Sequence, residues 1–301
     1  MQKKILVVLI GATAVGKTAM AIRLAKHFDT AILSADSRQV FKEMTIGTAK
    51  PSEAELAAVP HYFIDSHSIQ EEFNAGQFEK NALSVLEKIF SKNNFALLVG
   101  GSGLYVKALC EGIDQMPQID PKIRQNLQEE FEKNGLQPLL DELQAADPLY
   151  FEQVDRQNHQ RIIRALEICR HSQKPYSDFR IKEKVERNFE ILKIGLEMDR
   201  QKLYERIDQR MDLMLENGLW QEAQNLFPLR HLNALQTVGY KEIFDCLENH
   251  YDQHEAIRLL KRNSRRYAKR QLTWFGADKE ITWFGNEDFE KIIDWIEQKI
   301  A

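Results

Sequence analysis

The chain has 301 residues, of which 43% are hydrophobic and 29% charged, and its formal net charge is −4 at pH 7. This composition is typical of a soluble globular protein with one large domain or two, and it excludes collagen, a coiled coil and general disorder. The longest apolar run, residues 5–10, is far shorter than the roughly 20 residues of a membrane helix, so no membrane segment is predicted.

Short apolar runs alternate with amphipathic segments through the first hundred residues. The predicted strands are 5–10, 30–34, 61–65 and 95–99, and the predicted helices are 17–27 and 76–92. Strands and helices that alternate at this spacing form a parallel sheet with helices on its faces, and such sheets bind ligands beyond the carboxyl ends of their strands. The predicted fold class is therefore α/β.

The character of the sequence changes at about residue 115. From there to residue 184 it is polar and helix-rich, punctuated by prolines and without a clear strand. Residues 189–195 then alternate like a strand and are expected to return to the first sheet, after which helical patterns continue. The predicted organisation is a core of residues 1–114 and 185–301, interrupted by a helical insertion domain of residues 115–184.

The first predicted strand leads into a phosphate-binding loop. Residues 11–18 read Gly-Ala-Thr-Ala-Val-Gly-Lys-Thr and match the pattern G-x-x-x-x-G-K-[ST] between a strand and a helix. Backbone amides of such a loop surround phosphate oxygens, its lysine adds a cation, and its hydroxyl binds Mg²⁺. The loop residues are Gly11, Ala12, Thr13, Ala14, Val15, Gly16, Lys17 and Thr18. Lys17 and Thr18 are predicted to be catalytic, with Thr18 as a magnesium ligand.

An acidic residue follows the second predicted strand instead of the fourth. Asp36 comes just after residues 30–34, whereas residues 95–99 run into Gly-Gly-Ser-Gly without an acid. A carboxylate at this edge could bind Mg²⁺ through water, orient a substrate or accept a proton as a general base. The structural alternative is a helix cap, a position that Asp favours.

Six segments carry a specific resemblance. They are 34–41 (Ser-Ala-Asp-Ser-Arg-Gln-Val-Phe), 46–51 (Ile-Gly-Thr-Ala-Lys-Pro), 100–105 (Gly-Gly-Ser-Gly-Leu-Tyr), 160–167 (Gln-Arg-Ile-Ile-Arg-Ala-Leu-Glu), 238–240 (Val-Gly-Tyr) and 269–275 (Lys-Arg-Gln-Leu-Thr-Trp-Phe). Together with the phosphate-binding loop, they resemble the motif set of the bacterial tRNA dimethylallyltransferase (isopentenyltransferase) family. The resemblance spans nearly the whole chain in the family's order.

The resemblance implies a P-loop NTPase-like core and a metal-assisted alkyl transfer. The dimethylallyl group of dimethylallyl diphosphate would move to the N6 amine of the adenosine 3′ to a tRNA anticodon, position 37, with Mg²⁺ as cofactor. The phosphate-binding loop and Arg200 would bind the diphosphate, although Asp199-Arg200 also fits the start of a surface helix. Asp36 would be the base that takes the proton of the attacking amine, which is a poor nucleophile.

The resemblance also implies the residues that contact the anticodon stem-loop. They are Asp36, Ser37, Arg38, Gln39, Ser102, Arg124, Gln160, Arg161, Ile162, Ile163 and Arg164. The amides of Gln39 and Gln160 suit base edges, and the arginines suit phosphate or stacking. Since Arg161 and Arg164 are three residues apart on one helical face, Ile162 and Ile163 would turn inward. The insertion domain would grip the RNA, and the enzyme is expected to be a monomer.

A second cluster of cations lies near the end of the chain. Residues 261–270 hold six Lys and Arg and no acid. In a helix, a continuous cationic side would be formed by Arg258, Arg262, Arg265, Arg266 and Lys269, while Leu260, Tyr267 and Leu272 would face the core. An RNA surface is favoured over an ordinary solvated face. Of the four tryptophans, Trp274 beside this tract is the one to consider for base stacking.

The residues alone also allow other functions. The phosphate-binding loop is also typical of a small-molecule kinase, a nucleic-acid-binding NTPase or an adenylate isopentenyltransferase. Relative to the family's common pattern, Ala12 replaces Pro, Ser102 replaces Thr, Phe41 replaces Tyr, and Gly276 stands where Arg is usual. Three widely spaced cysteines indicate neither a disulfide framework nor a zinc site, so the cytoplasm is expected.

Overall fold

The computed structural model describes residues 3–114, 116–180 and 184–300. Backbone contacts divide the chain into two compact units. Unit 1 consists of residues 1–110 and 186–301, and unit 2 consists of residues 111–185. The change in composition at about residue 115 therefore lies close to the first boundary between the units.

Unit 1 is built on one parallel sheet. Its strands are β1 (Ile5–Gly11), β2 (Ile32–Ala35), β3 (His61–Tyr62), β4 (Phe95–Gly100), β5 (Glu190–Glu197) and β6 (Thr282–Gly285). Their order is β3-β2-β4-β1-β5-β6, and every pair is parallel. The α/β fold class predicted from the sequence is confirmed.

Two strands differ from the prediction. The chain pairs with β2 only at His61 and Tyr62, because Phe63 and Asp65 then take φ values of 65° and 50°, which are incompatible with a strand. The edge strand β6 was not predicted, since four residues are too few to show an alternating pattern.

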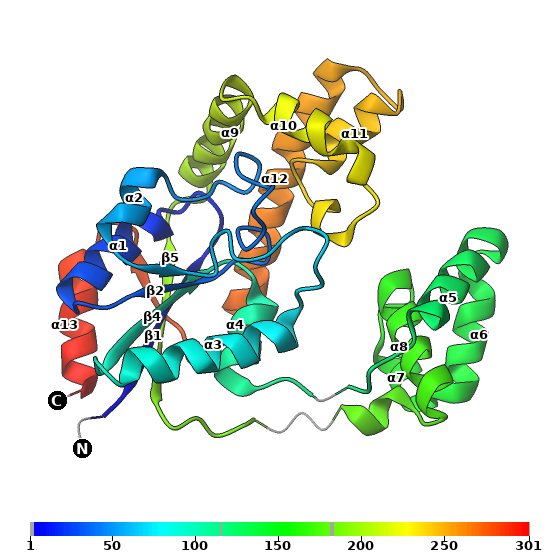
Figure 1. Cartoon of the computed structure of the whole chain (residues 1–301), viewed down its shortest axis with the longest axis horizontal. Coiled ribbons are helices and arrows are strands. Elements are labelled where there is room, and N and C mark those ends of the chain that lie inside the picture. Colours follow the sequence, from blue (N-terminus) through cyan, green and yellow to red (C-terminus); the bar gives the residue numbers. More distant parts are fainter. Residues whose placement is uncertain (1–2, 115, 181–183, 301) are drawn as a thin grey trace. The chain divides into compact units, whose positions relative to one another are not determined.

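Helices cover both faces of the sheet (Figure 1). The helices that begin in unit 1 are α1 (Lys17–His27), α2 (Glu53–Ala58), α3 (Ala75–Phe90), α4 (Gly103–Glu111), α9 (Arg200–Glu216), α10 (Leu219–Leu226), α11 (Lys241–Leu247), α12 (Gln253–Gly276) and α13 (Phe289–Ile300). Short 3₁₀ turns occur at Phe227–Leu229 and Asn233–Leu235. Helices α3 and α4 pack on one face, and α1, α9 and α13 on the other.

The central strand explains this layering. Along β1, Leu6, Val8 and Ile10 pack into the first core, and Ile5, Val7 and Leu9 pack into the second. A strand buried on both faces appears in the sequence as an unbroken apolar run, which is the pattern of residues 5–10. Because Ile10 pairs with Gly100 and Ala35 also pairs with Gly100, β1, β2 and β4 end at one edge.

A third core lies beyond that edge. It joins α9, α10, α11 and α12 to residues of the segment 40–46, including Val40, Phe41 and Met44. These three side chains are almost completely buried. The apolar side chains of the segment that follows β2 are therefore packed on the C-terminal helices.

Unit 2 is a small helical domain with its own core. Its helices are α5 (Pro121–Asn134), α6 (Gln137–Ala146), α7 (Pro148–Gln153) and α8 (His159–Ser172), followed by a 3₁₀ turn at Tyr176–Phe179. Leu127, Leu143 and Leu166 are fully buried at its centre. Arg170 on α8 pairs with Glu130 and Glu142 at 2.7 and 2.6 Å, which ties α5, α6 and α8 together.

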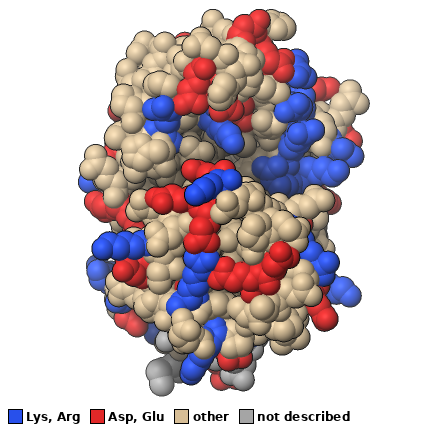
Figure 2. All heavy atoms as spheres, turned by 90° about the vertical axis from the view of Figure 1, so that its right-hand side faces the viewer, with Lys and Arg blue, Asp and Glu red and all other residues tan. Residues whose placement is uncertain are grey.

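No helix in the described ranges is long and apolar enough to cross a membrane. Figure 2 shows basic and acidic side chains intermixed over most of one face, with one denser group of Lys and Arg. This mixture fits a net charge of −4, and it means that any polyanion must be held locally.

Candidate active site

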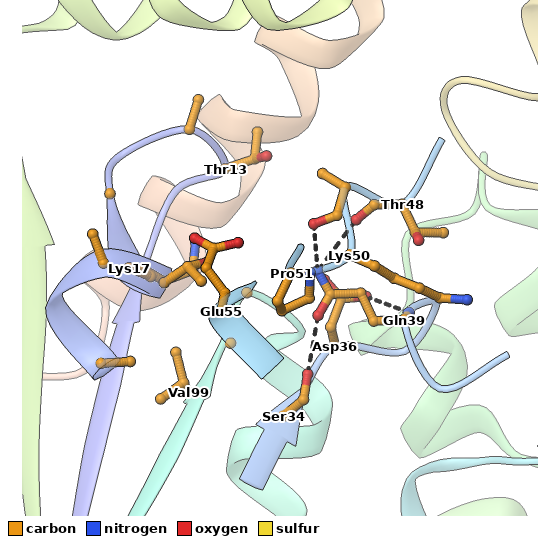
Figure 3. A pocket seen from close by; sticks show the side chains of 18 of the residues that line it. Thr13, Lys17, Ser34, Asp36, Gln39, Thr48, Lys50, Pro51, Glu55 and Val99 are labelled. Carbon is orange, nitrogen blue, oxygen red and sulfur yellow. Dashed lines mark hydrogen bonds between the residues drawn. The ribbon is translucent and has the colours of Figure 1, made fainter. Parts of the chain in front are cut away.

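A cavity of about 500 Å³ opens in unit 1 at the carboxyl ends of β1, β2 and β4. The phosphate-binding loop and the start of α1 form one part of its wall. The turn after β2, the segment 48–51, α9 and α12 contribute further parts, as do Glu55 of α2, His61 and the end of β4. Figure 3 shows Thr13 and Lys17 on one side and Asp36, Gln39 and Thr48 on the other. The predicted position of the site is thus where the structure has its cavity.

The phosphate-binding loop presents its backbone and Lys17 to this cavity. Gly16 holds a φ of 111° at the N-cap of α1, a conformation that a residue with a side chain seldom adopts. The cavity wall includes Thr13, Ala14, Gly16, Lys17 and Thr18, whereas Gly11, Ala12 and Val15 are buried behind it. The start of α1 adds amides and the positive end of a helix dipole.

Lys17 is folded back onto the loop. Its Nζ donates hydrogen bonds to the carbonyl oxygens of Gly11 and Ala12 at 3.0 and 2.8 Å. Burial and, to a lesser extent, the positive charge of Arg210 lower the pKa of Lys17 to about 8, while the negative charge of Asp36 opposes the shift. The pKa is depressed because desolvation and a like charge both disfavour the ammonium form, and an anion in the cavity would favour it.

Two arginines of α9 complete the basic wall, and the sequence analysis missed both. Arg206 and Arg210 line the cavity, and Nη1 of Arg210 donates to Oγ1 of Thr13 at 3.3 Å. The signal was available, since two arginines four residues apart in one predicted helix share a face. Burial lowers the pKa of Arg210, but an arginine stays charged at neutral pH.

Arg200, the predicted diphosphate contact, is not among the residues that line the cavity. It is exposed at the start of α9, and its Nε donates to the hydroxyl of Tyr204 at 3.1 Å. The preceding Asp199 caps α9 by accepting the amides of Gln201 and Lys202. The structure therefore places Asp199 and Arg200 as the start of a surface helix.

Gln271 of α12 holds the two loops at the cavity together. Its Oε1 accepts the amide of Thr13 at 2.8 Å, and its Nε2 donates to the carbonyl of Gly101 at 3.0 Å. The side chain is 6% exposed, so both hydrogen bonds form in a protected environment. The loop after β1 and the turn after β4 are thereby fixed relative to each other.

Asp36 lies in the cavity wall and also organises its own turn. Its Oδ1 accepts the amides of Arg38 and Gln39 at 2.8 and 3.2 Å, so this oxygen caps a turn, whereas the structural alternative was the cap of a helix. Its Oδ2 has no hydrogen bond within the part of the chain that the structure describes. One carboxylate oxygen thus fixes the turn while the other is available as an acceptor.

Two phenols share the surroundings of Asp36. Burial raises the pKa of Tyr105 and of Tyr267 to about 12, and the negative charge of Asp36 contributes in the same direction. Burial also lowers the pKa of Arg38, which Asp36 partly offsets. At neutral pH, Asp36 therefore stands among neutral hydroxyls and the cations Lys17, Arg38 and Arg210.

Ser102 supports the turn that carries Asp36. Its hydroxyl accepts the amide of Ser37 at 2.9 Å and donates to the Ser37 hydroxyl at 3.2 Å. The serine that replaces the family's threonine thus keeps a hydroxyl in use. Neither Ser37, Arg38 nor Ser102 belongs to the cavity wall, but all three are bonded to the turn beside it.

Gln39 is occupied within the protein. Its Nε2 donates to the carbonyls of Thr48 and Ala49 at 3.2 and 3.1 Å, and its Oε1 accepts the hydroxyl of Ser34 at 3.2 Å (Figure 3). The prediction that this amide is suited to a base edge is not supported in this structure, because its hydrogen-bonding groups hold the segment 48–49 against β2.

The residues assigned to the RNA on unit 2 fall into two groups. Gln160 and Arg161 are exposed on α8, as an RNA contact requires. The side chains of Ile162 and Ile163 are 0% and 5% exposed in the core of unit 2. Their inward orientation is as predicted, and it leaves no exposed side-chain surface for a contact with RNA.

Arg124 and Arg164 meet on one buried carboxylate. Glu167 is 1% exposed, and its oxygens lie 3.3 Å from Nη1 of Arg124 and 2.9 Å from Nη1 of Arg164. Both arginine side chains keep about half of their surface exposed, 58% and 42%. A buried acid thus orients two arginines of different helices toward solvent.

The basic helix α12 differs from the prediction in two respects. Arg258, Lys261 and Arg265 pair with Glu255, Asp212 and Asp208, so the expected continuous cationic side is partly neutralised by acids outside the tract. Tyr267 lines the cavity instead of facing a core, while Leu260 is buried as expected. Arg266, Lys269 and Arg270 remain as exposed cations.

Glu222 anchors the loop between Thr45 and Pro51, a role that the sequence did not indicate. Its carboxylate accepts the amides of Thr45, Ile46 and Gly47 at 3.0, 2.8 and 2.9 Å. The hydroxyl of the fully buried Tyr240 donates to the same carboxylate at 2.6 Å, and burial beside Glu222 raises the pKa of this phenol. The motif residues 46–51 and 238–240 thus meet at one glutamate.

The cavity has oxygen donors that fit a magnesium ion. Thr18, Asp36 and Glu55 line it, and Mg²⁺ prefers oxygen ligands, retaining several waters and binding substrate phosphates through few protein groups. Thr18 would bind directly and Asp36 through water. The one cluster of three potential metal-binding side chains in the described residues, Asp245, Glu248 and His250, lies elsewhere and is largely exposed.

A family model and curated proteins that resemble this chain all belong to one enzyme family. Residues 39–278 match the model of the IPP transferase family. The tRNA dimethylallyltransferase of Cytophaga hutchinsonii is 53% identical over 297 residues, which cover 99% of this chain and 98% of that protein. The tRNA dimethylallyltransferase of Christiangramia forsetii is 50% identical over 296 residues, 98% of each chain.

Two solved structures are similar in fold and sequence. The tRNA isopentenylpyrophosphate transferase of Bacillus halodurans has a TM-score of 0.73 and 37% identity, covering 99% of this chain and 97% of that one. A eukaryotic dimethylallyltransferase described as acting on tRNA has a TM-score of 0.77 and 25% identity, covering 98% of this chain and 77% of that one.

We predict that Glu222→Gln and Tyr240→Phe lower kcat by about 10- to 100-fold, because small displacements at a reacting centre have effects of this order. Each change loosens the segment 45–51, which is bonded to Gln39 and through it to the Asp36 turn. Affinity for a diphosphate ligand should be unchanged, since Glu222 does not touch the phosphate-binding loop. Steady-state kinetics and equilibrium binding distinguish these effects.

The matched control for this prediction is Tyr251→Phe. It removes a hydroxyl that donates to the carbonyl of Glu242 at 3.0 Å, in the same helical region but away from the segment 45–51. Equal losses of kcat in Tyr240→Phe and Tyr251→Phe, or a parallel loss of diphosphate affinity, would show that Glu222 acts only on overall stability.

Proposed function

The chain belongs to the IPP transferase family and is a tRNA dimethylallyltransferase, and we propose that it takes the dimethylallyl group from dimethylallyl diphosphate. The acceptor would be the N6 amine of the adenosine 3′ to the anticodon, position 37. The observation that carries this proposal is one cavity with a basic phosphate loop facing a carboxylate, Asp36, across it (Figure 3).

The basic wall suits a diphosphate leaving group. During transfer, the bond between the allylic carbon and the diphosphate oxygen breaks, and the oxygens gain negative charge. The loop amides, Lys17 and Arg210 are already in place around this position, so they stabilise departure without reorganising. Arg206, exposed at the cavity, adds a further cation.

Asp36 is placed to act as the base. The N6 lone pair is conjugated with the adenine ring, so removal of an N6 proton during attack on the allylic carbon assists the reaction. Oδ1 is committed to two backbone amides, and Oδ2 would accept the proton. Because the turn holds Oδ1, the carboxylate stays oriented through the reaction.

Magnesium, when bound at Thr18 and the substrate phosphates, would neutralise the charge that develops on the leaving diphosphate. Thr18 would contribute its hydroxyl, and Asp36 would hold a water of the magnesium shell. Lys17 and Arg210, the protein's own cations, would orient the dimethylallyl diphosphate.

We assign contacts with the anticodon stem-loop to the exposed polar residues of unit 2. Arg124 and Arg164 are oriented by Glu167, and Gln160 and Arg161 are exposed on the first turn of α8. Phosphate contacts from such arginines fix the RNA, while the target base leaves its stack to enter the cavity. The proposal places the enzyme in the cytoplasm, as a monomer.

The direct test is incubation of the purified protein with Mg²⁺, dimethylallyl diphosphate and unmodified tRNA, followed by mass spectrometry of the nucleosides. We expect a five-carbon prenyl addition to the adenosine 3′ of the anticodon, and strong reductions in Lys17→Ala and Arg210→Ala. No adduct, together with phosphate release from ATP, would assign the chain to a kinase or NTPase instead.

Replacing Asp36 by Asn should lower the rate of transfer by about 10²- to 10⁴-fold. Asn keeps an oxygen that can accept the amides of Arg38 and Gln39, so the turn is retained while the base is lost. Single-turnover measurement gives the rate, and filter binding should give nearly wild-type tRNA affinity. A wild-type rate would remove Asp36 from the role of base.

The arginines of unit 2 should determine how tRNA affinity depends on salt. Each phosphate contact contributes about 0.7 to 0.9 to the slope of log affinity against log salt. Arg161→Gln and Arg164→Gln should therefore each reduce the magnitude of this slope by that amount. Lys80→Gln, an exposed lysine of α3, is the control and should leave it unchanged. Unaltered slopes in both arginine variants would contradict these contacts.

A further inference from the structure

One face of α12 runs along the active site. Tyr267, Gln271 and Trp274 are spaced i, i+4 and i+7, which places them in one row on a helix. Tyr267 and Gln271 line the cavity, and Gln271 bonds to Gly101. Trp274 is the next member of this row in the direction away from Tyr267.

The indole of Trp274 lies on the backbone at Gly103, the first residue of α4. A Cβ added to Gly103 would be 2.2 Å from Nε1 and 2.3 Å from Cδ1 of this ring, so the contact exists only because residue 103 has no side chain. Gly103 follows Ser102, whose hydroxyl is bonded to Ser37 beside Asp36. The ring is therefore within a short chain of direct contacts from the proposed base.

Trp274 differs from the other tryptophans in being exposed. It keeps 47% of its surface accessible, and Leu104, which follows Gly103, keeps 52%. Trp220, Trp283 and Trp295 are instead packed against the three cores of unit 1. A half-exposed ring that contacts a loop of the active site is not explained by packing.

The charges nearby suit a polynucleotide. Lys269 and Arg270 lie on the same helix as Trp274, within five residues of it, and both are exposed. Exposed aromatic rings flanked by cations are the means by which proteins hold unstacked bases of single-stranded RNA, since every base offers a flat face and the backbone is anionic.

We propose that Trp274 is a stacking platform for the nucleotide next to the target adenosine. This inference rests on the proposed function, because that adenosine must unstack from its neighbours to enter the cavity. When the adenosine leaves the stack, the neighbouring base loses one stacking partner. The exposed indole replaces that partner, while Lys269 and Arg270 attract the adjoining phosphates. Trp274 thereby determines how the loop is presented, and it takes no part in proton or alkyl transfer.

The test uses Trp274→Ala, Trp274→Leu and Trp274→Phe in the full chain, with an anticodon stem-loop RNA as the probe. Loss of one base stack weakens binding by about 5- to 150-fold, and we expect this range for Ala and Leu and a smaller effect for Phe. Leu retains an apolar contact with Gly103 and so separates stacking from stability, which thermal unfolding reports. Affinity for dimethylallyl diphosphate should be unchanged, and Trp295→Phe is the matched control.

The decisive measurement combines these variants with altered RNA. Stem-loops with an abasic site on the 5′ or the 3′ side of the target adenosine remove one candidate base at a time. The penalty of Trp274→Leu should disappear on one of these two RNAs and persist on the other. An equal penalty on both RNAs, or none on the intact stem-loop, would overturn the proposal. Binding is read without prenyl transfer, so failure here differs from failure of wild-type transfer, which would refute the proposed function.

Discussion

The side chain of Gln271 is the constraint on which the active site depends. Its amide joins the phosphate-binding loop to the turn after β4. Ser102, which belongs to that turn, accepts a hydrogen bond from the backbone next to Asp36. The acid and the phosphate cradle come from different strands, so their separation is fixed only if the two loops are fixed. A buried amide with both groups satisfied gives that rigidity, because losing either hydrogen bond leaves a buried polar group unpaired, at a cost of about 1–3 kcal/mol.

The cavity concentrates positive charge around the phosphate-binding loop, where we propose that the diphosphate binds. Burial depresses the pKa of both Lys17 and Arg210, and a neighbouring cation lowers each further: Arg210 acts on Lys17, and Arg206 acts on Arg210. An empty site of this kind is electrostatically unfavourable, and a bound polyanion relieves the repulsion. Asp36 offsets part of this repulsion, so the residue that we propose as the base also helps to keep the basic wall charged.

Several side chains that resemble RNA contacts are instead used to build the site. Gln39 binds the carbonyls of residues 48 and 49, and Glu222 fixes the start of the same segment through three amides. Lys261 and Arg265 pair with acids of α9. The RNA surface that we propose is therefore smaller than the number of cations in the sequence suggests. It consists of residues whose charge is exposed, such as Arg161, Lys269 and Arg270.

The sequence by itself determined the features that are local along the chain. The strand, loop and helix around Lys17 are contiguous, and residues 5–10 form a strand buried on both faces, so the P-loop core and the position of Asp36 after β2 could be predicted. The tertiary structure alone decided which distant residues complete the site. Arg210 is 197 residues from Thr13, and Gln271 is 258 residues from it. Such contacts depend on how helices pack against the sheet, and the pairing of Arg265 with Asp208 likewise follows from a neighbour that no local pattern specifies.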